Sequence, residues 1–67
     1  MNIDARGCSC PEPVLMTKRA VDKNENTIVV TVDNKIALQN ITRFATGQRY
    51  SVSVEEIGED FVLTLSK

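Results

Sequence analysis

Histidine and tryptophan are absent from this sequence of 67 residues, and its only aromatic residues are two phenylalanines and one tyrosine. Without an imidazole there is no Cys-His pair, which argues against protease-like and acyl-transfer chemistry. So few aromatic rings also argue against a platform for stacking nucleic-acid bases. Eight basic and nine acidic residues give a formal net charge of −1, whereas domains that bind nucleic-acid phosphates are strongly basic. We therefore expect no direct nucleic-acid partner.

Long apolar runs are absent as well. No stretch approaches the roughly 20 apolar residues that a membrane-spanning helix needs. The first residues, MNIDARGC, carry Asp4 and Arg6 where a signal peptide has its apolar core. The two cysteines of the sequence are too few for a disulfide-stapled secreted domain. These absences predict a cytoplasmic protein without a membrane partner, whose cysteines are reactive or metal-binding rather than structural.

The length predicts a single domain spanning residues 1–67. A domain this small is close to the lower limit for an independent core. Hydrophobic residues make up 42% of the sequence and charged residues 25%, which is the composition of a globular domain rather than a disordered one. A complete domain and a fragment of a longer chain fit the sequence equally well.

Six segments have the pattern of regular secondary structure. The expected order is strand 2–5, helix 11–23, strand 27–32, helix 35–46, strand 50–56 and strand 61–65. The segment TIVVTV is β-branched throughout and apolar on both faces, which predicts a central strand. The last two strands alternate apolar and polar residues around the turn IGED, which predicts an antiparallel hairpin.

The two expected helices are amphipathic. The first should bury Val14, Thr17, Ala20 and Val21, with Leu15 and Met16 widening the apolar stripe. The second should bury Ala37, Ile41, Phe44 and Ala45, begin after an N-cap at Asp33 or Asn34, and end at Gly47. Two such helices and four strands predict an α/β (α+β) two-layer sandwich, in which both helices cover one face of a mixed four-stranded sheet.

All the cysteines and prolines of the chain lie in one segment, RGCSCPEPV, between the first strand and the first helix. Proline is well tolerated in the first turn of a helix, where backbone N–H groups lack partners. The residue before a proline is disfavoured in the helical conformation, so either Cys10 or Glu12 is the expected N-cap. In both cases Cys10 lies at or within one turn of a helix N-terminus.

This position favours a reactive thiol at Cys10. The positive end of the helix dipole and the unpaired N–H groups stabilise a thiolate. Arg6 would add to this effect if it folded over the loop, whereas a nearby Glu12 would oppose it. A thiolate without a histidine base suits sulfur exchange, in which little proton transfer is needed. The alternative is that the cysteines simply pack, since free cysteine is often buried, and this alternative is stronger for Cys8 than for Cys10.

The segment DARGCSCPEPVLMTKRAV resembles the start of the TusA/SirA family of sulfur carriers, in which a strand and a glycine lead to a Cys-Pro-x-Pro motif. Cys10, Pro11 and Pro13 match every defined position of that motif, and Gly7 matches the glycine. The resemblance covers the whole chain, and the second half looks most like the N-terminal domain of YedF-type proteins.

The resemblance implies a two-layer α/β sandwich and a sulfurtransferase-type carrier without a cofactor. It implies that Cys10 receives sulfane sulfur as a persulfide from a donor such as a cysteine desulfurase and passes it to an acceptor protein. Members of the family serve tRNA thiolation, sulfur oxidation or selenium handling. Partners would dock around the Cys10 loop, where Arg6, Glu12, Lys18 and Arg19 are candidate contacts, although solvated charges are the simpler interpretation of these four residues.

Cys8 departs from the family, which usually has an apolar residue there. We hypothesise that Cys8 attacks a Cys10 persulfide and releases sulfide, although Cys8 as a small apolar substitute explains the sequence equally well. Three other functions stay open. They are soft-metal binding, such as Cu(I) held by Cys8 and Cys10, a regulatory or protein-interaction domain without chemistry, and a thiol–disulfide oxidoreductase. A structural zinc site is not expected because four ligands are lacking.

Overall fold

The computed structural model describes residues 1–7 and 12–67 of the chain. Its elements are β1 (Asn2–Asp4), α1 (Glu12–Asp22), β2 (Thr27–Val32), α2 (Lys35–Gly47), β3 (Ser51–Ile57) and β4 (Asp60–Ser66). The strands form one mixed sheet in the order β1-β2-β4-β3. β1 pairs with β2 in parallel, and β4 pairs antiparallel with both β2 and β3.

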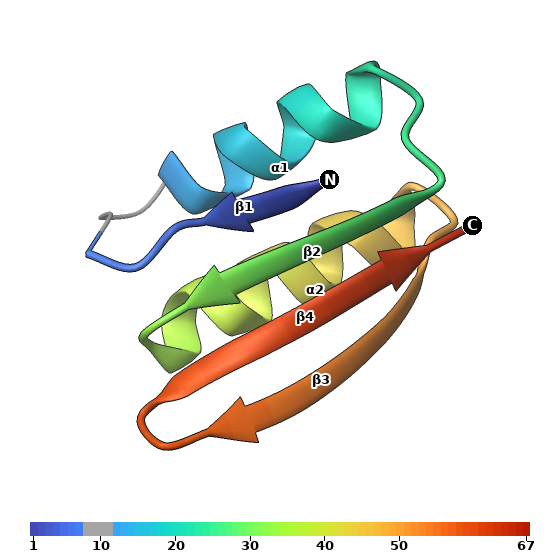
Figure 1. Ribbon diagram of the computed structural model, residues 1–67. Coiled ribbons are helices and arrows are strands. Elements are labelled where there is room, and N and C mark those ends of the chain that lie inside the picture. The colour runs from blue at the N-terminus through green and yellow to red at the C-terminus, as the bar shows by residue number, and fades with distance from the viewer. Residues whose placement is uncertain (8–11) are drawn as a thin grey trace.

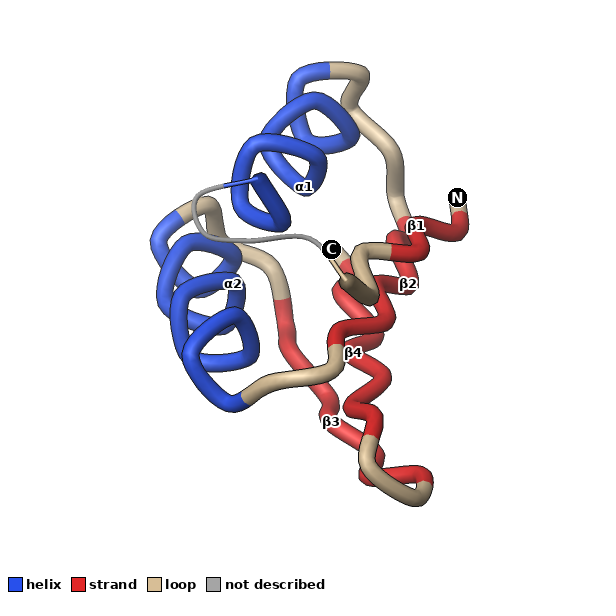
Figure 2. The backbone as a smooth tube through the Cα atoms, turned by 90° about the vertical axis from the view of Figure 1, so that its left-hand side faces the viewer, coloured by secondary structure: helices blue, strands red, loops and turns tan. Residues whose placement is uncertain are grey.

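Both helices lie on one side of the sheet, as Figure 2 shows. The predicted two-layer α/β sandwich is therefore confirmed, including the element order and the central place of TIVVTV. The sheet side of the core comes from alternate residues of the two central strands. These are Ile28, Val30 and Val32 of β2 and Phe61, Leu63 and Leu65 of β4, all buried.

The helix side of the core agrees with the predicted stripes in most positions. In α2 the buried residues are Ala37, Ile41 and Ala45. In α1 they are Pro13, Thr17 and Ala20, so the stripe is centred closer to the N-terminus than predicted. The prediction for Leu15 was wrong, because this residue is 47% exposed and does not belong to the buried stripe.

The two ends of α2 differ in how well the sequence predicted them. Asn34 is the N-cap of α2, because its Oδ1 accepts the N–H of Ala37 over 2.8 Å. Gly47 does not form the left-handed C-cap that was expected. It is the last helical residue, and the left-handed backbone occurs at Arg49, with φ of 68°. The N–H of Tyr50 donates to the carbonyl of Ala45. The helix thus ends at Gly47, one residue beyond the predicted range of 35–46, and the left-handed residue follows two positions after Gly47.

The β3–β4 hairpin turns at Gly58, which has a φ of 61°. Ile57 and Asp60 pair across a two-residue loop, and a glycine with positive φ at the first loop position suits such a turn. The predicted turn at IGED is thereby confirmed. In the described part of the chain, neither helix is long and apolar enough to cross a membrane.

Candidate functional site

Four element ends meet on one side of the molecule (Figure 1). Since β1 and β2 are parallel, their carboxyl ends share one edge of the sheet, and the N-termini of α1 and α2 lie at the same edge. In open α/β sheets this edge is where ligands and reactive groups are commonly placed. Residues 8–11 lie in sequence between Gly7 and Glu12, and both Gly7 and Glu12 belong to this edge.

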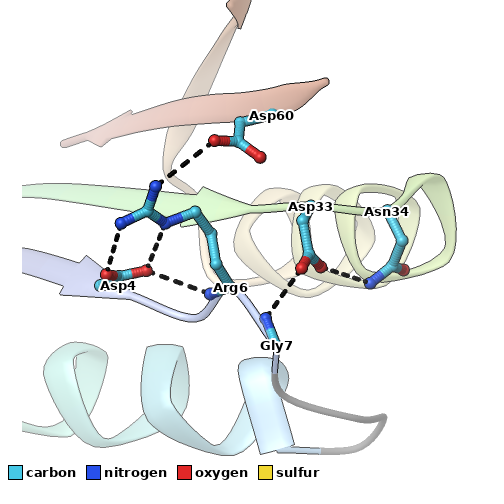
Figure 3. A network of polar contacts seen from close by, with 6 residues as sticks. All are labelled: Asp4, Arg6, Gly7, Asp33, Asn34 and Asp60. Atoms are coloured by element: carbon cyan, nitrogen blue, oxygen red, sulfur yellow. Dashed lines mark hydrogen bonds and ion pairs between the residues drawn. The ribbon is translucent and has the colours of Figure 1, made fainter. Parts of the chain in front are cut away.

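Gly7 is anchored at this edge from a distant part of the chain. Its backbone N–H donates to Oδ2 of Asp33 over 2.8 Å, and the amide of Asn34 donates to the other carboxylate oxygen over 3.2 Å. The φ of Gly7 is 77°, which is strained for any residue with a Cβ. The N-cap of α2 and the residue that leads into the cysteine segment therefore form one hydrogen-bonded unit (Figure 3).

Arg6 lies across three strands of the sheet. Its Nε and Nη2 donate to the two carboxylate oxygens of Asp4 over 2.9 and 3.0 Å, and its backbone N–H donates to Oδ1 of Asp4 over 3.1 Å. Nη1 lies 3.5 Å from Oδ2 of Asp60 at the start of β4. As Figure 3 shows, the guanidinium faces these two carboxylates, so its charge is shared with them and is not free to act on the neighbouring loop alone.

These contacts shift the pKa values of the groups involved. The hydrogen bonds from Arg6 lower the pKa of Asp4 from 3.8 to about 2, and the pKa of Arg6 is raised by the same partner. The backbone N–H of Gly7 is the main cause of a lowered pKa at Asp33, with Asn34 adding to it. Hydrogen bonds to the charged form of a group favour that form, so Asp4 and Asp33 stay ionised down to acidic pH.

The start of α1 contains the second half of the motif, Glu12 and Pro13. Pro13 is buried in the first turn, and its carbonyl accepts the hydroxyl of the buried Thr17 over 2.9 Å. Glu12 is the first residue of the helix and is exposed, so it is not the N-cap. Cys10, the other candidate cap, lies outside the described residues.

The structure thus locates six of the predicted site residues. Gly7 and Pro13 are anchored as described, Arg6 precedes the motif in sequence, and Glu12 lies within it. Lys18 is further along α1 and pairs with Asp22 over 3.1 Å. Arg19 lines a groove beside β1 and not the edge where the motif lies. Cys8, Cys10 and Pro11 lie outside the described residues.

The sequence analysis missed Asp33 as a site residue. It was considered only as a helix cap, a role that Asn34 takes. The contact of Asp33 with Gly7 joins residues 26 positions apart, and no local pattern signals such a contact. The described residues contain no group of three or more metal-ligating side chains, and both cysteines lie outside them.

A small two-layer α/β domain that carries a cysteine motif between its first strand and first helix defines the class of protein. A family model described as sulfurtransferase TusA matches residues 1–67. The chain belongs to this family, which confirms the resemblance seen in the sequence.

Two relatives agree with the family assignment. A Methanocaldococcus jannaschii protein named as a candidate sulfur carrier protein is 41% identical over 68 residues, which cover 97% of this chain and 91% of that protein. The crystal structure of a SirA-like protein from Desulfitobacterium hafniense superposes with a TM-score of 0.89 at 32% identity, covering 97% of this chain and 93% of the other. The chain is therefore a TusA/SirA-family protein with a sulfur carrier role. Such a role requires a sulfur donor and a sulfur acceptor.

Proposed function

We propose that Cys10 is the residue that carries the sulfur, held as a persulfide. The observation that carries the proposal is the family match over residues 1–67 together with the Cys10-Pro11-Glu12-Pro13 motif at the start of α1. The N-terminus of an 11-residue helix favours negative charge close to it, and this supports a thiolate as the reactive form of Cys10.

The transfer step is an exchange at sulfur. The Cys10 thiolate attacks the outer sulfur of a persulfide on the donor protein. A new S–S bond forms at Cys10, the donor S–S bond breaks, and the donor cysteine leaves as a thiolate. The reverse type of attack, by a thiolate of the acceptor on the outer sulfur at Cys10, returns Cys10 to its starting state. No net oxidation or reduction occurs, and no histidine base is needed.

The anchored residues on either side of Cys10 in sequence support this role. Gly7 is held by Asp33 on one side, and Pro13 is buried on the other. A reacting group held by rigid flanking elements loses less freedom when it meets its partner. A donor such as a cysteine desulfurase would dock over this edge, with Arg6 and Glu12 as the nearest charged contacts and Lys18 and Arg19 further along α1. We place this exchange in the cytoplasm, where reducing conditions keep thiols free.

The test is sulfur loading followed by intact mass spectrometry. Wild-type protein, Cys8→Ser and Cys10→Ser would each be incubated with a cysteine desulfurase and cysteine. We expect a gain of one sulfur atom in wild type and in Cys8→Ser, and none in Cys10→Ser. Treatment with a thiol reductant should remove the added mass and release sulfide, which separates a persulfide from other adducts.

The outcomes separate the competing functions. Loading that persists in Cys10→Ser would move the carrier role to Cys8 and contradict the proposal. No loading of any variant, by the desulfurase or by a low-molecular-weight persulfide, would favour a regulatory domain or a soft-metal site. A Cu(I) titration of the same three proteins would then distinguish these two, because only a metal site requires both thiols.

A further inference from the structure

A groove of about 220 Å³ lies between the edge strand β1 and helix α1. Met1 and the strand residues Asn2 and Ile3 form one wall. The helix residues Met16 and Arg19, with Lys23 just after the end of α1, form the other. The groove lies beside the beginning of β1, whereas the cysteine motif follows the other end of this strand. It is therefore a surface separate from the sulfur-transfer site.

Within residues 1–7 and 12–67, β1 pairs with no strand other than β2, so its other edge is free. The carbonyl of Met1 accepts the N–H of Val29 and the N–H of Ala5 donates to the carbonyl of Thr31, both over 2.8 Å. Backbone groups of alternate residues in a strand point to opposite edges, so the N–H and C=O of Asn2 point away from β2. An extended peptide can add to such an edge through main-chain hydrogen bonds.

The helix side of the groove carries two cations without a counterion. Arg19 and Lys23 are one helical turn apart, and within residues 1–7 and 12–67 neither side chain makes a hydrogen bond or ion pair. The neighbouring Lys18, in contrast, pairs with Asp22. Like charges at this spacing repel each other, so an anion bound between Arg19 and Lys23 would relieve the repulsion.

The floor of the groove is apolar and small. Ala20 is 1% exposed, and Ile3 and Met16 are half-buried against the core. Methionine side chains adapt readily to different apolar partners. The volume is below the roughly 300–1,000 Å³ of sites for drug-sized ligands, so the groove suits a single apolar side chain and not a nucleotide.

We propose that this groove binds an extended acidic segment of a partner protein as an added strand. The peptide backbone pairs with the free edge of β1 at Asn2, and an apolar side chain enters between Ile3 and Met16. An acidic group of the peptide lies against Arg19 and Lys23. A second copy of this chain is a poorer occupant, because pairing of β1 with its own copy brings two Arg19–Lys23 pairs together and adds like-charge repulsion.

The experiment is an NMR titration of the ¹⁵N-labelled full chain with a hexapeptide pool, in which each position is Asp, Glu, Leu, Val or Met. We expect saturable shift changes at the amides of Asn2, Ile3 and Met16 and few elsewhere. The Arg19→Glu/Lys23→Glu double variant should bind at least about tenfold more weakly. The matched variant Lys35→Glu/Arg43→Glu reverses two exposed charges on α2 and should bind as wild type does.

Further titrations identify what binds in the groove. A backbone N-methylated pool should fail to bind, because it cannot pair with the strand edge. Equal binding of that pool, or of the free acid 4-methylpentanoate, would show that no strand is added and would overturn the proposal. Absence of shift changes at β1 and α1, or equal binding of a pool with Lys and Arg in place of Asp and Glu, would overturn it too. If the same shift changes appear when the protein alone is concentrated, the occupant of the groove is a second copy of the chain and not a peptide, which would overturn the proposal.

Discussion

The carboxylate of Asp33 accepts the backbone N–H of Gly7 over 2.8 Å, although the two residues are 26 positions apart. The contact ties the turn between β2 and α2 to the residue that leads into the cysteine motif. Asn34 completes the unit, because it donates to Asp33 and also caps α2 through Ala37. The cysteine motif is a run of consecutive residues, yet the glycine that leads into it is held by a residue that is distant in the sequence.

Removing the Asp33 carboxylate should free the Gly7 amide. We expect Asp33→Ala to raise the hydrogen-exchange rate of this amide about tenfold, since a charge-assisted hydrogen bond is lost. Asp33→Asn keeps an acceptor oxygen and should give a smaller increase. The measurement is amide exchange by NMR, with Asp22→Ala on α1 as a control that leaves Gly7 unchanged. An unaltered Gly7 exchange rate in Asp33→Ala would show that the contact does not hold the loop in solution.

Acid should destabilise the protein by protonating two carboxylates, that of Asp4, which pairs with Arg6, and that of Asp33, which accepts the N–H of Gly7. The pKa of Asp4 is about 2 in the folded state against an ordinary 3.8, and that of Asp33 is lowered as well. A depressed folded-state pKa contributes stability above the unfolded pKa and loses it as pH falls through the folded one. We therefore expect the urea midpoint to fall as pH decreases from about 4 to about 2.

Two variants check the origin of this acid sensitivity. Asp4→Asn removes the titrating group and should flatten the dependence of the urea midpoint on pH over this range. Glu59→Gln should leave it as in wild type, because Glu59 makes no ion pair in the described ranges 1–7 and 12–67. High salt should weaken the effect, since these charges are exposed. The same slope in wild type and in Asp4→Asn would assign the acid sensitivity to other carboxylates.

The fold could be predicted from the sequence because its determinants are local. The β-branched run of β2, the alternation in β4 and the apolar spacing of α2 each specify an element, and two crossover connections leave few ways to assemble them. Periodicity shows which side of an element is apolar, but not whether another element covers it. Leu15 was expected to face the core for this reason, yet it is 47% exposed.

The site could be predicted only in part, for the same physical reason. The chemistry of proline and cysteine at a helix start can be read from the sequence, and Gly7 could be identified as a break between the first strand and the first helix. The pairing of Arg6 with Asp60 and of Gly7 with Asp33 depends on strands that are brought together by the fold. Such contacts follow from the sheet order and not from sequence spacing.

The sheet is well covered at β4 and less covered at β3, and this difference gives a prediction about stability. Leu63 and Val54 are directly opposite each other on neighbouring strands, but Leu63 is fully buried and Val54 is 46% exposed. We expect Leu63→Ala to cost about 2–5 kcal/mol of unfolding free energy, because it leaves a cavity in the core. Val54→Ala should cost less than about 1 kcal/mol. Urea unfolding of both variants tests this, and equal losses would mean that the edge of β3 is covered in solution.

The role of Cys8 gives the last prediction, which depends on the proposed Cys10 persulfide. The Cys8 thiolate would attack the Cys10 sulfur of the persulfide, form a Cys8–Cys10 disulfide and release HS⁻ as the leaving group. Formation of the disulfide from the two cysteine thiols releases two electrons, and the sulfane sulfur takes up these two electrons as it becomes sulfide, so the electrons balance. We therefore expect the persulfide of Cys8→Ser to decay several-fold more slowly than that of wild type.

Sulfide release and intact mass report this step independently. Loaded wild type should end two hydrogens lighter than the reduced protein, as a disulfide requires, whereas loaded Cys8→Ser should keep its added sulfur. Ser9→Ala retains both thiols and serves as the matched control, with decay as in wild type. Equal decay of wild type and Cys8→Ser, without loss of the two hydrogens, would leave Cys8 as a small apolar residue in place of the one usual in the family.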